Sequence, residues 1–205
     1  CVLSEYWGLY HMRLRQNKKT FKRLDLTRPD SLFLIDNTGL DKDWGRCSEF
    51  DELVSFCNQV TDFTNENYDQ LDELIDLENI ADYLIVNSWF GNRDWVTNNV
   101  LAMKPAGYGK WEYVLSDLEA TMLNAEDNMF ANIAAGSGPH AEIMQCLLGF
   151  DQFRKAIQNR YYELQYKELD PVLLKENLAQ KRLEYTPAVE LHRSRWAQFS
   201  FQQSW

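Results

Sequence analysis

Hydrophobic residues recur at helical spacing along much of the chain after residue 46. Residues 48–60 place their apolar side chains on one face of a helix, behind an acidic start at Ser48. These apolar positions are Phe50, Leu53, Val54, Cys57 and Val60. Residues 67–90 keep the same period and become apolar on nearly every side in their last turns. We therefore predict a buried helix that leads directly into Gly91.

The carboxy-terminal half shows further helical periods, and Asp170 followed by Pro171 predicts a helix start, with a cap and a first-turn proline. The predicted helices span 140–149, 150–169 and 170–199. Before them, residues 131–140 are small and polar. That segment is either a loop beside an active site or an ordinary connector.

Strand patterns occur in two other parts of the chain. Residues 2–16 alternate apolar and polar side chains with many aromatic rings, which predicts one or two strands, and residues 17–36 are expected to continue as loop and strand. Two short apolar runs flank a turn at 105–110 that is rich in proline and glycine. This predicts a β-hairpin lying between Asp94 and Asp117.

These elements predict an α+β fold. Residues 1–45 would form a partial amino-terminal sheet region and residues 46–205 a helical lobe, together one continuous domain. The formal net charge of -10 argues against broad binding to nucleic-acid phosphates. No apolar run approaches the ~20 residues of a membrane span, and the chain opens on Cys1 without a signal-like segment. We expect a soluble domain cut from a longer protein.

Cysteine and histidine spacing argues against a structural zinc site, because no Cys-x-x-Cys or Cys/His cluster occurs. The residues concerned are Cys1, Cys47, Cys57, Cys146, His11, His140 and His192. Cys57 and Cys146 stand among apolar neighbours at helical spacing, so we predict that both are small buried residues. Their disulfide state is left open by the sequence.

The stretch GNRDWVTNN, residues 91–99, carries the candidate chemistry. Its spacing matches the catalytic loop H-R-D-x-x-x-x-N of protein kinases, with Asp94 as the acid and Asn99 five residues later. Asp117, in SDLE, stands where kinases carry D-F-G, after the predicted hairpin. Phosphoryl transfer needs a carboxylate to position a hydroxyl and hard oxygen ligands for Mg²⁺.

The same stretch resembles the spore coat protein H (CotH) kinases, a family of atypical protein kinases with a Gly-Asn-x-Asp loop and an acidic strand end, here KWEYVLSDLE. Further similar segments are YWGLYHM, LENIADYLIVNSWFGN and LLGFDQFRKAIQNRYYEL. The resemblance implies a protein-kinase-like fold, with a mostly helical lobe and a small amino-terminal antiparallel sheet. Two positions depart from the family pattern: Leu14 replaces an expected glutamate, and Glu119 replaces an aspartate.

Carried over by resemblance, Asp94 is the catalytic acid, Asn99 and Asp117 contact the cofactor, and Asp117, Asn99 and Glu119 hold the metal. The implied cofactors are ATP and Mg²⁺, and the implied partner is a protein with a Ser or Thr acceptor. The resemblance also implies a place outside the cytosol, at a cell surface or coat structure.

Other interpretations of these residues remain open. Asp94 could cap a helix that begins at Trp95, and Arg93 is expected to act as a structural ion-pair partner. Asp117 and Glu119, expected to share one face at a strand end, could form a solvated acidic edge. The domain as a whole could be a catalytically degenerate module for binding or assembly. A glycosidase with two carboxylates would not need the kinase-like spacing.

Overall fold

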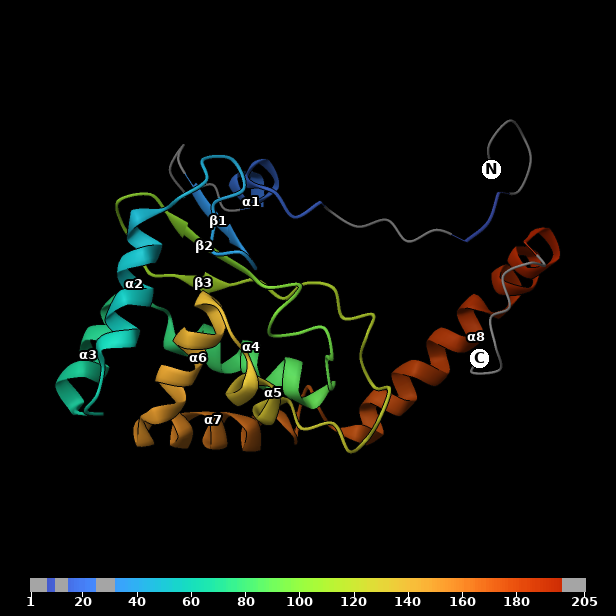
Figure 1. Ribbon diagram of the computed structural model, residues 1–205. Coiled ribbons are helices and arrows are strands. Elements are labelled where there is room, and N and C mark those ends of the chain that lie inside the picture. Colours follow the sequence, from blue (N-terminus) through green and yellow to red (C-terminus); the bar gives the residue numbers. More distant parts are fainter. Residues whose placement is uncertain (1–6, 10–14, 25–31, 197–205) are drawn as a thin grey trace. The chain divides into compact units, whose positions relative to one another are not determined.

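A computed structural model describes residues 7–9, 15–24 and 32–196 (Figure 1). The chain forms two compact units, one of residues 16–161 and one that combines residues 1–15 with 162–205. The expected division at residue 45 stays a prediction. The candidate site residues all belong to the unit of residues 16–161.

The predicted α+β class is confirmed. The elements are α1 (Lys18–Leu24), β1 (Leu32–Asp36), α2 (Ser48–Gln59), α3 (Asn65–Leu74), α4 (Leu77–Trp89), β2 (Leu101–Pro105), β3 (Glu112–Tyr113), α5 (Met129–Ala135), α6 (Pro139–Gly149), α7 (Asp151–Leu164) and α8 (Pro171–Arg195). In the unit of residues 16–161 the sheet lies on one side and α7 on the other, with α4 and α6 between them (Figure 1).

The three strands form one antiparallel sheet in the order β1-β2-β3, and β2 with β3 is the predicted hairpin. Strand β1, from the amino-terminal part, pairs with β2 along its whole length, from Leu32 opposite Pro105 to Asp36 opposite Leu101. The hairpin is also attached to α2, because Glu49 accepts hydrogen bonds from Lys104 Nζ at 2.6 Å and from the Gly107 amide at 3.2 Å. The sheet thus joins segments far apart in sequence.

Two sequence expectations about this unit were wrong. Residues 18–24 form α1 rather than a loop, since Asn17 Oδ1 accepts the Thr20 amide at 2.9 Å and so caps the helix start. The long helix predicted over residues 67–90 is divided into α3 and α4 at Ile75. There Asp76 caps α4 through the Asn79 amide, while its own amide bonds the Trp111 carbonyl at 2.9 Å.

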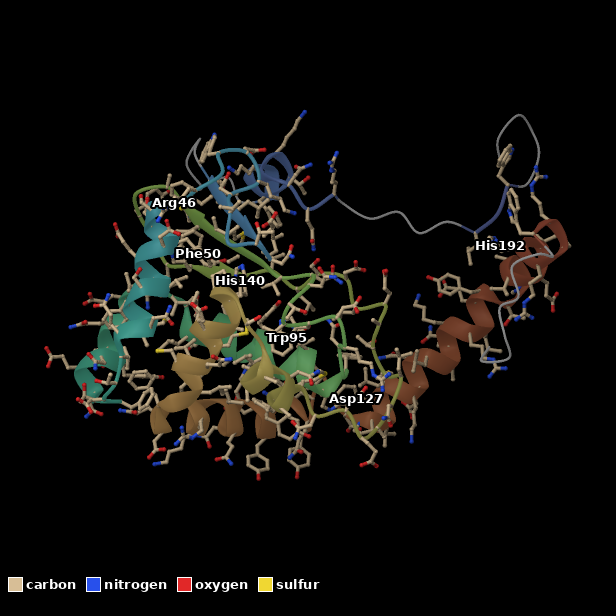
Figure 2. The ribbon with its side chains drawn as sticks, in the orientation of Figure 1. Arg46, Phe50, Trp95, Asp127, His140 and His192 are labelled. Atoms are coloured by element: carbon tan, nitrogen blue, oxygen red, sulfur yellow. The ribbon has the colours of Figure 1, made fainter. Side chains whose placement is uncertain are left out.

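The core beneath the sheet contains a buried histidine (Figure 2). His140, on α6, is 2% exposed and packs against the Phe50 ring, 5.0 Å between centroids. Its Nδ1 lies 3.0 Å from the Tyr113 hydroxyl and its Nε2 lies 2.7 Å from the Asp36 carbonyl oxygen. A carbonyl can only accept, so Nε2 carries the proton and Nδ1 accepts from Tyr113. These two hydrogen bonds connect α6 to both outer strands of the sheet, β1 and β3.

The small polar segment at 131–140 is not one continuous loop. Its first half belongs to α5, which Asn128 caps through the Ala131 amide at 3.1 Å. Only residues 136–138 connect α5 to α6. Cys57 and Cys146 are buried, as predicted, and both are free thiols, as is buried Cys47. Cys1 lies outside the described residues.

The second unit is built on α8, whose predicted start is confirmed: Asp170 accepts the Val172 amide, and Pro171 is the first helical residue. Near the other end of α8, Trp196 Nε1 donates to the Trp7 carbonyl at 2.8 Å. Residues 7–9 and 15–16 do not form the expected strand, and the remainder of that predicted segment lies outside the described residues. No helix in the described part of the chain is long and apolar enough to cross a membrane.

Candidate functional site

The two acidic loops leave the same end of the hairpin. Ala102 faces Tyr113 in the antiparallel register, and the Val114 amide donates to the Leu101 carbonyl at 2.8 Å. Asn99 lies just before the first of these strands and Asp117 just after the second. The hairpin turn lies at the opposite end, so the loop with Asn99 and the loop with Asp117 begin as neighbours.

A buried polar connection anchors the Asp94 loop to α4. Asn92 is fully buried and donates its Nδ2 to Asn87 Oδ1 at 2.9 Å, and Asn87 Nδ2 in turn donates to the Tyr83 carbonyl. Trp95 is also buried, and its Nε1 donates to the Tyr83 hydroxyl at 2.9 Å. Asp94 thus stands between two immobilised neighbours, which fixes where its backbone lies.

Asp94 itself is exposed. The alternative interpretation as a helix cap is wrong, because residues 94–97 form turns and no helix begins at Trp95. Within the described part of the chain, no hydrogen bond or ion pair engages the Asp94 carboxylate. An exposed carboxylate with no internal partner on a fixed loop is able to accept a hydrogen bond from a bound hydroxyl.

Asp117 and Asn99 share a rare backbone conformation. Their φ angles are 51° and 56°, in the left-handed region that residues other than glycine seldom adopt. Asp117 is half-buried, and its Oδ1 is shielded from solvent with no hydrogen-bond partner among the described residues. A buried carboxylate oxygen without a donor is costly, and a bound cation would remove that cost. Local strain of this kind is concentrated at functional sites in proteins.

The strand geometry expected for Asp117 and Glu119 is not found. Strand β3 ends at Tyr113, and residues 114–118 have no regular structure. The left-handed turn at Asp117 also breaks the alternation that would place both carboxylates on one face. Asp117 is half-buried and Glu119 is exposed. The role of Glu119 as a metal ligand stays a prediction, but a shared strand face with Asp117 no longer supports it.

Two backbone hydrogen bonds join the Asp94 loop to the segment after Asp117. The Arg93 amide donates to the Ala120 carbonyl at 3.2 Å, and the Met122 amide donates to the Phe90 carbonyl at 2.7 Å. The chain therefore returns from Asp117 to lie alongside residues 90–93. This pairing brings together two loops that are linked in the sequence only by motif spacing.

Arg93 reinforces this connection through an ion pair, as expected of a structural arginine. Its Nε lies 2.6 Å from Asp127 Oδ2 and its Nη2 lies 2.9 Å from Asp127 Oδ1, a bidentate pair. Asp127 lies in the loop that leads into α5 (Figure 2). The hydrogen bonds from Arg93 lower the pKa of Asp127, and the same contact raises the pKa of Arg93.

We expect the Arg93→Gln substitution to raise the pKa of Asp127 toward its ordinary value, because the charged donor that stabilises the carboxylate is removed. Carboxyl carbon chemical shifts of the Asp127 side chain, followed through an acid titration, measure this change. Arg46→Gln is the matched control, since Arg46 pairs with Asp51 elsewhere in the same unit. An unchanged Asp127 titration in Arg93→Gln would contradict the role assigned to the ion pair.

Asp127 and Asn87 are not among the candidates that the sequence patterns indicate. Asp127 is 34 residues from Arg93 and belongs to no recognisable motif. Asn87 stands within an apolar helical stretch, where a polar residue on a buried face was the available signal. Leu14, the departure from the family pattern, lies outside the described residues.

Comparison with known proteins agrees with the geometry. A family model described as CotH kinase protein matches residues 2–205. Neither a curated protein nor a solved structure matches the chain. The family match covers nearly the whole sequence. A kinase-like fold, as expected for this family, is consistent with the α+β architecture of the chain. The chain belongs to the CotH kinase family.

Proposed function

We propose that this chain is a protein kinase that transfers the γ-phosphate of ATP to a Ser or Thr hydroxyl of a protein, with Mg²⁺. The observation that carries the proposal is the pairing of two different carboxylates at one end of the hairpin. Among the described residues, the exposed Asp94 carboxylate has no partner, and Asp117 has a buried oxygen that lacks a donor. A hydroxyl acceptor needs the first kind of group and a hard cation needs the second.

The residues at the site suit Mg²⁺ better than a cation that takes all of its ligands from protein side chains. No group of three or more His, Cys, Asp or Glu side chains suited to a metal gathers in the described parts of the chain. Mg²⁺ commonly uses one or two carboxylates and takes its other ligands from phosphates and water. Asp117 and the Asn99 amide would hold it, with Glu119 as a further acid. Bound there, Mg²⁺ would neutralise phosphate charge.

The residues of the chain would then have separate roles in the transfer. Asp94 would accept a hydrogen bond from the acceptor hydroxyl and orient its oxygen toward the γ-phosphate. The bonds from Asn92 to Asn87 and from Trp95 to Tyr83 would keep that carboxylate in place. The Arg93–Asp127 pair would hold the two loops together. Positioning and electrostatics of this kind account for most of the catalysis in phosphoryl transfer.

Calorimetric titration of MgATP into the chain tests the proposal. We expect binding that requires the divalent ion and that weakens at least about tenfold in Asp117→Ala, because the buried carboxylate oxygen is lost. Asp69→Ala, at an exposed acid on α3, is the matched control and should bind as the unsubstituted chain does. A folded chain that binds no MgATP, or an Asp117→Ala variant that binds it equally well, would refute the kinase assignment and favour a binding or assembly module.

A further inference from the structure

Two buried thiols lie on helices that pack against each other. Cys57 belongs to the last turn of α2 and Cys146 to the second half of α6, and the two helices lie side by side (Figure 1). The two side chains are in contact, because the Cys57 thiol donates a hydrogen bond to the sulfur of Cys146. The proposed phosphoryl transfer uses neither residue.

A second side-chain contact holds α2 and α6 together beside the two sulfurs. Asn58 Nδ2 donates to Glu142 Oε2 at 2.8 Å. Asn58 directly follows Cys57, and Glu142 lies one helical turn before Cys146. Both thiols are also enclosed, Cys57 at 5% and Cys146 at 8% exposed. The facing positions of the two cysteines are therefore set by the packing of the helices, and sulfurs already in contact need only a short approach to form a bond.

Their surroundings make the two sulfurs chemically unequal. The hydrogen bond from Cys57 lowers the pKa of the Cys146 thiol, and the same bond, together with burial, raises the pKa of Cys57. The Glu142 carboxylate raises the pKa of Cys57 further, because two negative charges would repel each other. Since the thiolate is the reactive form of cysteine, Cys146 is the stronger nucleophile of the pair.

Cys47, the other buried thiol, is not placed to react with either of them. It precedes the first residue of α2, ten positions before Cys57, which along a helix is roughly 15 Å. A disulfide requires Cα atoms within about 7 Å of each other. Burial also raises the pKa of Cys47, so its thiol stays protonated. Cys47 therefore provides a matched control on the same helix.

From these contacts we propose that Cys57 and Cys146 are a reversible oxidation site, at which hydrogen peroxide forms a disulfide between α2 and α6. The Cys146 thiolate attacks one peroxide oxygen, the O–O bond breaks, and hydroxide leaves, so that Cys146 becomes a sulfenic acid. The Cys57 sulfur then attacks the Cys146 sulfur, the S–O bond breaks, and the departing hydroxide takes the Cys57 proton as water. Two thiols and one peroxide thus give one disulfide and two waters. The site does not depend on the kinase assignment.

Peptide mapping of the peroxide-treated, folded chain tests the cross-link. Free thiols are blocked, and the chain is digested with trypsin and a glutamate-specific protease, which separates Cys47 from Cys57. We expect a linked peptide that joins Cys57 to Cys146 and that a phosphine reductant separates. Because the bond closes a long loop, oxidation should raise the melting temperature by roughly 5–15 °C.

Each variant is compared with itself before and after oxidation, so a less stable starting fold does not obscure the result. Cys47→Ala should keep the linked peptide and the rise in melting temperature, whereas Cys57→Ala and Cys146→Ala should lose both. Methionine oxidation affects all of these variants alike. The proposal is overturned if the folded chain gives no such linked peptide, or if Cys146→Ala keeps the rise in melting temperature.

Dimedone, which traps sulfenic acids, tests the order of the two steps. Cys57→Ser keeps a hydroxyl that can donate to Cys146 but removes the second sulfur, so the sulfenic acid should persist and be trapped on Cys146. Cys146→Ser is the matched reverse variant, in which labelling of Cys57 should be weaker by roughly fivefold or more. Stronger labelling of Cys57 than of Cys146 would contradict the proposed roles.

Discussion

Replacing Asp94 by asparagine should slow phosphoryl transfer by about a hundredfold to ten-thousandfold, the usual contribution of a catalytic acid–base group. Asparagine preserves the size of the side chain but cannot accept the proton of the hydroxyl. Because Asp94 is exposed and has no internal partner among the described residues, the substitution removes no bond that holds the fold. We therefore expect the loss in kcat, with the KM for ATP and the melting temperature unchanged.

Transfer of radiolabelled phosphate from γ-labelled ATP to casein and to the chain itself measures this effect, with ATP hydrolysis as a second readout. Asp69→Asn, an equivalent change at an exposed acid on α3, controls for the loss of one charge. Comparable rates in Asp94→Asn and the unsubstituted chain would exclude Asp94 as the catalytic acid. Asp117→Ala differs from Asp94→Asn because it should impair MgATP binding itself.

Mild acid should destabilise the unit of residues 16–161 through His140. Burial lowers the pKa of His140 to about 4, whereas the ordinary value in an unfolded chain is 6.5. Below pH 6.5 the unfolded chain therefore binds a proton that the folded chain refuses. The contribution of neutral His140 to stability is fully present above pH 6.5 and is lost as the pH falls toward 4. The total loss is about 3 kcal/mol, with a slope of at most about 1.4 kcal/mol per pH unit.

The groups facing His140 explain why the proton is refused. The Asp36 carbonyl accepts from Nε2, the Tyr113 hydroxyl donates to Nδ1, and the Phe50 ring covers the imidazole. A proton on Nδ1 would break the bond from Tyr113 and place a positive charge in the core, where no described carboxylate bonds the ring. Burial also raises the pKa of Tyr113, so its hydroxyl stays a donor.

Urea unfolding at several values between pH 7 and pH 5 measures this dependence, because most carboxylates, with ordinary pKa values near 4, titrate below that window. His140→Gln should be less stable at pH 7 and should lose less stability toward pH 5. His192→Gln, on α8, is the control and should keep the slope of the unsubstituted chain. A His140→Gln variant with that same slope would show that another group controls the acid response.

Local sequence patterns predicted much of the fold, because helices and hairpin turns are formed by interactions between residues close in sequence. The single apolar face of residues 48–59 and the proline-glycine turn at 105–110 were sufficient for α2 and the hairpin. The break at Ile75 was missed because Asp76 only acts as a cap once Trp111 takes its amide. An aspartate in a helical period looks equally suitable on a solvated helix face.

The candidate site shows the same division. Spacing brought out Asp94, Asn99 and Asp117 as candidates, and family resemblance proposed their roles. Spacing could not predict that the chain after Asp117 returns along residues 90–93, nor that Arg93 pairs with Asp127. Those contacts depend on how the 120–128 segment folds back, and no periodicity encodes that path.

By itself, the sequence determined the kinase-like family, the α+β class and most helices, and it proposed the residues for the chemistry, because composition, periodicity and motif spacing are local properties. Tertiary structure decided which carboxylate is exposed and which has a buried oxygen without a partner in the described part of the chain. It also decided that His140 is buried in the core and stays neutral. Each of these depends on burial and on partners distant in sequence, since the cost of a polar group is set by its surroundings and not by its neighbours along the chain.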